Sequence, residues 1–100
     1  MVISPIHFQQ DGIVHGGVIA TIADIVAGFS AVSLVQEDQR VVTGEIKISY
    51  FARGEGEKIK AIGRVIKPGK RMNFCEAEVY SITHGHEKLI AKATTSMITL

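Results

Sequence analysis

A histidine, two glycines and an aspartate are the residues of this chain best suited to chemistry. His15, Gly16 and Gly17 stand where a long apolar run begins, and Asp24 is the only ionisable side chain in residues 16–35. If that run is a helix, its first backbone N–H groups have no intrahelical partner and carry the positive end of the helix dipole. Glycine leaves these groups accessible, so the pattern predicts a cradle for a polarised carbonyl oxygen. An ordinary glycine-rich helix start is the alternative interpretation.

Asp24 stands too far along the predicted helix to act beside that cradle. It lies eight residues beyond Gly16, which corresponds to about 12 Å along a helix axis. If both groups act on one substrate, Asp24 must come from a second chain whose helix runs roughly antiparallel, so catalysis would require a dimer. The alternative is a buried carboxylate that is satisfied by hydroxyl groups, such as that of Thr21 or those of serines across an interface.

The helix that would position these groups is predicted from Gly16 to about Leu34. Apolar residues recur there at helical spacing on more than one face, so we expect the helix to be buried nearly all round. The run has the length of a membrane span, but Asp24 and many small residues reduce its hydrophobicity. The strands that follow also need an apolar element to cover, so we expect no membrane span.

Four later segments alternate between apolar and polar residues, as β-strands do. They are residues 40–51, 58–66, 73–82 and 89–100, and they are separated by predicted turns at 53–57, 67–70 and 83–86. Residues 1–8 predict a further strand, which Pro5 confines to an edge. Three tight connections in a row predict an antiparallel sheet. In residues 40–51 we expect Tyr50 on one face of the sheet and Thr43 on the other.

Small residues recur on the faces that we expect to point inward, where they would let a sheet curl closely round a helix. These residues are Gly44, Ala61, Gly63, Ala77, Ala91 and Ala93. The predicted fold class is therefore α+β, with one long central helix wrapped by a curved antiparallel sheet of about five strands. We expect residues 1–100 to form a single domain.

Composition narrows the function classes. The net charge is +1, so we expect no nucleic-acid partner. Cys75 is the only cysteine, which excludes an intrachain disulfide and suits a cytoplasmic location. His84 and His86 flank a glycine in a predicted turn without further clustered ligands, so we expect no metal site. A small chain with one long apolar helix has reason to share its core with another copy.

Three segments resemble a known family: Gly12–Asp24, Val42–Phe51 and the turn Gly69–Arg71. They are similar to the hot-dog-fold acyl-CoA thioesterases of the phenylacetic-acid-degradation type, within the 4-hydroxybenzoyl-CoA thioesterase superfamily. The likeness covers nearly the whole chain, and the spacing from the HGG motif to Asp24 is its most specific part. It implies a homodimer that joins two sheets, or a homotetramer of two such dimers, and no cofactor.

The resemblance also implies roles for individual residues. The amides of Gly16 and Gly17 would bind the thioester carbonyl, and Asp24 of the partner chain would act as general base or nucleophile. Thr43 would help to position water. Among the residues expected to bind substrate is His15, together with Gln9, which stands where relatives commonly carry an asparagine. Because the chain begins fourteen residues before His15, we expect it to lack the additional N-terminal helix of relatives.

The implied function is hydrolysis of an aryl- or short/medium-chain acyl-CoA. Arg53, Lys70 and Arg71 are candidates to bind the phosphates of coenzyme A. Candidates for the acyl-lined region are Val18, Ile22, Tyr50, Phe51 and Phe74. A non-catalytic acyl-CoA binding or sensing module on the same fold is the alternative. A hot-dog dehydratase ranks last, because it needs a histidine paired with an acid in the site.

Overall fold

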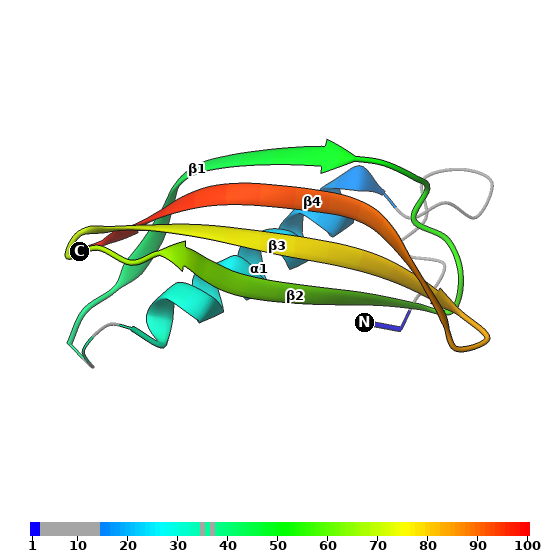
Figure 1. Ribbon diagram of the computed structural model, residues 1–100, viewed down its shortest axis with the longest axis horizontal. Coiled ribbons are helices and arrows are strands. Elements are labelled where there is room, and N and C mark those ends of the chain that lie inside the picture. Colours follow the sequence, from blue (N-terminus) through cyan, green and yellow to red (C-terminus); the bar gives the residue numbers. More distant parts are fainter. Residues whose placement is uncertain (3–14, 35, 37) are drawn as a thin grey trace.

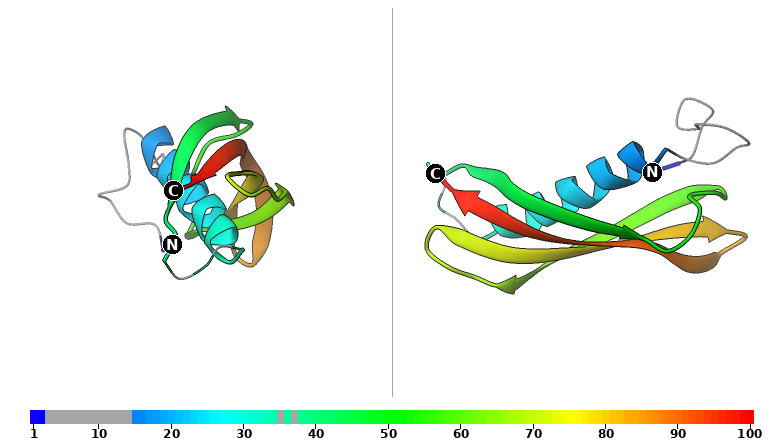
Figure 2. Two further views of the ribbon diagram at one scale, coloured as in Figure 1. Left: turned by 90° about the vertical axis from the view of Figure 1, so that its left-hand side faces the viewer. Right: turned by 90° about the horizontal axis from the view of Figure 1, so that it is seen from above.

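The computed structural model describes residues 1–2, 15–34, 36 and 38–100. Its elements are the helix α1 (Gly16–Val32) and the strands β1 (Val41–Tyr50), β2 (Lys58–Lys67), β3 (Met72–Thr83) and β4 (His86–Thr99). The strands form one antiparallel sheet in the order β1-β4-β3-β2, and α1 packs across one face of it (Figure 1). Figure 2 shows the sheet curving round the helix. The predicted α+β class and curved antiparallel sheet are confirmed, and the described residues contain four strands against the predicted count of about five.

Most of the predicted first strand, and the turn at Gly12, lie outside the described residues. Met1 and Val2 are described, and both lie along β2. Val2 forms an antiparallel bridge with Lys58. The Met1 amine donates to the Ile59 carbonyl over 2.6 Å, and the Ile59 N–H donates to the Met1 carbonyl over 2.7 Å.

The connection between β1 and β2 is not the tight turn that the sequence predicts. β1 and β2 lie at opposite edges of the sheet, so residues 51–57 must pass the ends of β4 and β3. Three strand spacings are about 14 Å, which a segment of this length spans easily when extended. A tight turn is not possible here because β1 pairs with the long strand β4 and not with β2. This pairing runs from Val41 opposite Thr99 to Tyr50 opposite Ala91. The other two turns are hairpins, as predicted.

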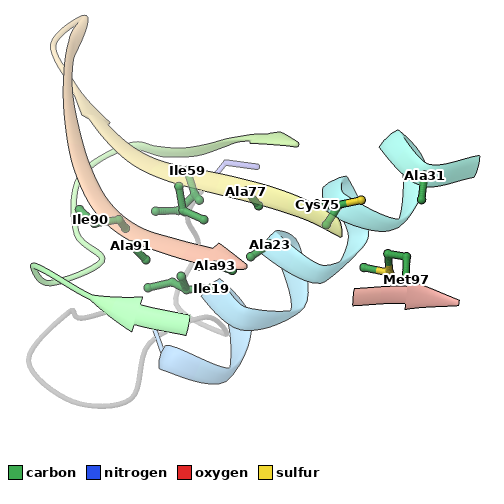
Figure 3. Packing of buried hydrophobic residues seen from close by; sticks show 12 residues of the cluster. Ile19, Ala23, Ala31, Ile59, Cys75, Ala77, Ile90, Ala91, Ala93 and Met97 are labelled. Carbon is green, nitrogen blue, oxygen red and sulfur yellow. The ribbon is translucent and has the colours of Figure 1, made fainter. Parts of the chain in front are cut away.

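The core lies between one stripe of α1 and the inner face of the sheet. The stripe consists of residues four apart that are at most 2% exposed, namely Ile19, Ala23, Ala27 and Ala31. Figure 3 shows Ile19, Ala23 and Ala31 on the side of the helix that faces the buried residues of β3 and β4. The small side chains permit a close approach, and a Cβ built on Gly63 of β2 would lie only 2.2 Å from the Val26 carbonyl oxygen.

The opposite side of α1 is exposed. Ile25, Phe29 and Val32 are 49%, 71% and 48% exposed, respectively. The prediction of a helix that is buried nearly all round is therefore wrong for the single chain, because one four-stranded sheet covers only one side of a helix. α1 also ends at Val32, two residues before the predicted end.

A β-bulge at Gly44 changes which side chains of β1 face the helix. Thr43 lies opposite Met97 and Glu45 lies opposite Ser96, so Gly44 is an extra residue in the register. A bulge of this kind reverses the alternation of side chains on one side of it. Thr43 and Tyr50 consequently both contact α1, and the prediction that they occupy opposite faces is wrong.

Candidate functional site

Asp24 is held by a hydroxyl group from the sheet. Thr43 Oγ1 lies 2.7 Å from Asp24 Oδ1, to which it donates, and 3.6 Å from the sulfur of Met97. The Thr21 hydroxyl donates to the Gly17 carbonyl instead, so it does not satisfy the carboxylate. Among the described residues, no further hydrogen bond reaches Asp24, and its second oxygen is available to a ligand or a water molecule.

A cavity of about 280 Å³ opens beside this acid. Apart from Asp24 and Thr43 its lining is apolar and comes from α1, β1 and β4: Ile25, Gly28, Phe29, Val32, Val41 and Met97. A concave apolar surface with few polar groups is typical of a site for an organic ligand. This cavity adjoins the exposed side of the helix.

Two backbone amides at the start of α1 have no partner among the described residues. His15 is the N-cap residue, with φ −54° and ψ 137°, and its side chain makes no capping hydrogen bond. The Val18 and Ile19 N–H groups both donate to the His15 carbonyl, over 3.0 and 3.3 Å. Within the described part of the chain, the N–H groups of Gly16 and Gly17 therefore have no backbone partner outside the helix. Such groups at a helix start can hold an oxygen that carries negative charge.

Tyr50 fixes this helix start from the sheet. Its hydroxyl donates to the Gly16 carbonyl over 2.9 Å, although the two residues are 34 positions apart in the sequence. The ring lies against Gly16, where an added Cβ would meet it at 3.4 Å. Sequence reasoning placed Tyr50 in the acyl-lined region and missed this contact, which no spacing of residue types signals.

The acid and the amides are not brought together within one chain. Thr43 binds Asp24 near the first half of β1, whereas Tyr50 binds Gly16 at the end of the same strand. The separation along the helix remains the roughly 12 Å expected from eight residues. A carbonyl group held at these amides would therefore lie out of reach of the Asp24 carboxylate of the same chain.

The other predicted site residues are scattered. Arg53 follows the end of β1, while Lys70 and Arg71 lie in the turn between β2 and β3. The N–H of Thr99, at the end of β4, donates to the Arg71 carbonyl, which places this turn at the other end of the molecule from Arg53. His15 is exposed at the helix start.

Of two further predicted positions, one falls outside the described residues and the other lies away from the site in the single chain. Gln9 lies outside the described residues. Phe74 is 47% exposed between the buried residues Asn73 and Cys75. Because side chains alternate along a strand, Phe74 points to the outer face of the sheet, away from α1, and does not line the cavity beside Asp24.

Charged residues gather on that outer face and pair with one another. Arg64 bridges to Glu76 and Glu78, and Lys60 pairs with Glu87 over 2.8 Å. The hydrogen bond to Glu87 raises the pKa of Lys60, and the hydrogen bond that Tyr80 donates to Glu78 raises the pKa of the Tyr80 phenol. These groups face solvent on the side of the sheet opposite the helix, so we assign them no role in the site.

The part of the chain that the structure describes contains neither a helix that could span a membrane nor a cluster of metal ligands. No helix there is long and apolar enough to cross a membrane. No group of three or more His, Cys, Asp or Glu side chains in residues 1–2, 15–34, 36 and 38–100 is placed to hold a metal ion.

A family model described as "Thioesterase superfamily" matches residues 11–87. Among curated proteins, the medium/long-chain acyl-CoA thioesterase YigI of Escherichia coli K12 is 30% identical over 98 residues, which cover 84% of this chain and 61% of YigI. The chain spans about three fifths of the length of the curated relatives it matches.

Solved structures resemble the whole chain. A thioesterase family protein from Silicibacter pomeroyi matches with a TM-score of 0.98 and 32% identity, covering 100% of this chain and 74% of that one. The BH2602 protein from Bacillus halodurans, solved with CoA, matches with a TM-score of 0.94 and 28% identity, covering 100% of this chain and 68% of that one. The curved sheet around one helix is thus the hot-dog fold found in thioesterase structures.

Proposed function

This chain belongs to the thioesterase superfamily, and from that membership we propose that it hydrolyses the thioester bond of an acyl-coenzyme A. In this proposal the amides of Gly16 and Gly17 hold the carbonyl oxygen, and Asp24 of a partner chain activates the attacking water. The products are a carboxylic acid and the free thiol of coenzyme A. The proposal needs no cofactor.

The observation that carries the proposal is the pair of half-sites on one helix. The amides at the helix start can stabilise the negative charge that develops on the carbonyl oxygen. Asp24, fixed by Thr43 at 2.7 Å, keeps one oxygen available to take a proton from water. Because the two halves lie about 12 Å apart along α1, a working site takes one half from each of two chains.

The sheet offers a way to join two such chains. Within the described residues, one edge of β1 pairs with β4 and the other edge has no partner. If two β1 strands pair antiparallel about Ile46 and Lys47, Thr43 of one chain comes opposite Tyr50 of the other. Since Thr43 holds Asp24 and Tyr50 holds Gly16, this register would bring the acid of one chain to the amides of its partner. We therefore propose a homodimer, with a pair of dimers as a larger assembly.

The same arrangement suggests where the substrate lies. The apolar cavity beside Asp24 suits an aryl or a short/medium acyl group, and an acyl-CoA substrate accords with the relatives named for acyl-CoA thioesterase activity or solved with CoA. Antiparallel pairing reverses one chain relative to the other. It would thus bring the end that carries Lys70 and Arg71 towards the end of the partner that carries Arg53, where these cations could bind the phosphates of coenzyme A.

The test is a thiol-release assay with a panel of aryl-, short- and medium-chain acyl-CoA substrates. We expect Asp24→Asn to lower kcat by about 10²- to 10⁴-fold, the range for loss of a general base. Asp38→Asn, which changes an exposed carboxylate beyond the helix, is the matched control and should retain wild-type turnover. Unchanged hydrolysis by Asp24→Asn would remove this acid from the mechanism. Binding of acyl-CoA by the wild type without thiol release would favour the non-catalytic binding module.

A further inference from the structure

The contact between Tyr50 and Gly16 acts on the peptide unit that supplies part of the carbonyl cradle. The Gly16 carbonyl and the Gly17 N–H belong to one peptide group, which is planar and trans, so they point in opposite directions. A hydrogen bond that fixes the carbonyl therefore fixes the direction of the N–H. It also polarises the group, because hydrogen bonds in a chain strengthen one another.

Two adjacent glycines weaken the local restraint on this peptide group, which lies in the first turn of α1. Glycine has the widest range of backbone conformations, and the N-cap His15 contributes no side-chain hydrogen bond to the helix start. The Tyr50 hydroxyl at 2.9 Å supplies a restraint from outside the helix. Its own position is secure, because Tyr50 pairs with the buried residue Ala91 and the next N–H, that of Phe51, donates to the Ile90 carbonyl over 2.7 Å.

We infer that Tyr50 is a positioning residue for catalysis: its hydroxyl aligns and polarises the Gly16–Gly17 peptide so that the Gly17 N–H meets the thioester oxygen. This inference rests on the proposed thioesterase function. Tyr50 does not touch the reacting atoms in this role. It acts through the Gly17 amide, and the bond it controls strengthens as charge develops on the oxygen in the transition state.

The decisive variant is Tyr50→Phe, which removes one oxygen atom and keeps the ring against Gly16. We expect kcat to fall about five- to tenfold, the loss expected for a single hydrogen bond, while KM changes by less than twofold. Tyr80→Phe is the matched control, because the Tyr80 hydroxyl donates to Glu78 on the outer face of the sheet. It should leave both constants at wild-type values, and melting curves should show both variants folded.

A second measurement needs no substrate. In an NMR spectrum, Tyr50→Phe should shift the backbone amide signal of Gly17 while leaving that of Gly28, on the same helix, in place. If the wild type hydrolyses acyl-CoA and Tyr50→Phe has the same kcat, the inference is overturned and the proposed function stands. If the wild type hydrolyses no acyl-CoA, the proposed function fails and the Gly17 signal decides: a shift supports control of this peptide by Tyr50, and an unmoved signal overturns it.

Discussion

One hydrogen bond determines how Asp24 can be used. A carboxylate in the middle of an apolar helix is costly unless it is paired or hydrogen-bonded, and here the Thr43 hydroxyl meets that need from the neighbouring strand. Among the described residues, Asp24 has no cationic partner. The hydrogen bond from Thr43 fixes the orientation of its carboxylate. In the proposed mechanism, this orientation aims the carboxylate at a proton of the attacking water.

Thr43→Val tests this arrangement, because it keeps the shape of the side chain and removes the hydroxyl. We expect kcat to fall about 10- to 100-fold, as for loss of a hydrogen bond to a charged group worth about 1.5–3 kcal/mol. Thr94→Val on the exposed face of β4 is the control and should keep wild-type kcat. Equal turnover in the two variants would show that Asp24 needs no such support.

At the scale of the elements, α1 and β2 can approach each other closely because Gly63 has no side chain. Gly63 lies against the backbone of the helix, where a Cβ would stand 2.2 Å from the Val26 carbonyl oxygen and 2.9 Å from the Ala27 nitrogen. The neighbours in question are backbone atoms, which cannot swing aside. This close contact fixes the spacing between α1 and β2.

Gly63→Ala should therefore lower the free energy of unfolding by about 1–3 kcal/mol or more, the usual cost of overpacking. Gly28→Ala is the contrasting variant, since a Cβ there meets nothing within 4 Å, and it should add up to about 1 kcal/mol through helix propensity. Urea unfolding of both proteins measures the difference. A Gly63→Ala protein that unfolds at the wild-type urea concentration would contradict the close contact.

At the scale of the whole molecule, the single chain has two surfaces that a partner could cover. The exposed stripe of α1 adjoins the edge of β1 that has no partner strand among the described residues, and both border the cavity lined by Asp24. An apolar surface and an unpaired strand edge are the features that a second copy would cover. The proposed shared site explains why both lie on the side of the acid.

Mixing two inactive variants tests whether the site is shared. Gly16→Pro removes one amide of the cradle, and proline suits this first helical position because His15 already has the extended conformation that proline requires. Asp24→Asn removes the acid. Each variant alone should be inactive, whereas co-expressed chains should form mixed dimers with one intact site and recover about a quarter of wild-type activity if the chains pair at random. No recovery in demonstrated mixed dimers would mean that both halves act within one chain.

The sequence alone determined the local features of this protein. Helical spacing from Gly16, alternation in the later segments and the pair Pro68–Gly69 predict elements from neighbouring residues, and the described structure contains them nearly at the predicted bounds. The distance of about 12 Å between Gly16 and Asp24 along the helix also follows from the sequence, because the rise per residue is constant in an α-helix.

Only the tertiary structure decided which distant segments meet. The pairing of β1 with β4 places residues 51–57 across the end of the sheet, and the bulge at Gly44 turns Thr43 towards Asp24. The contact from Tyr50 to Gly16 joins residues 34 positions apart. These features depend on the pairing of strands far apart in the chain and on how closely backbones approach, and a pattern of neighbouring residue types contains no information about either.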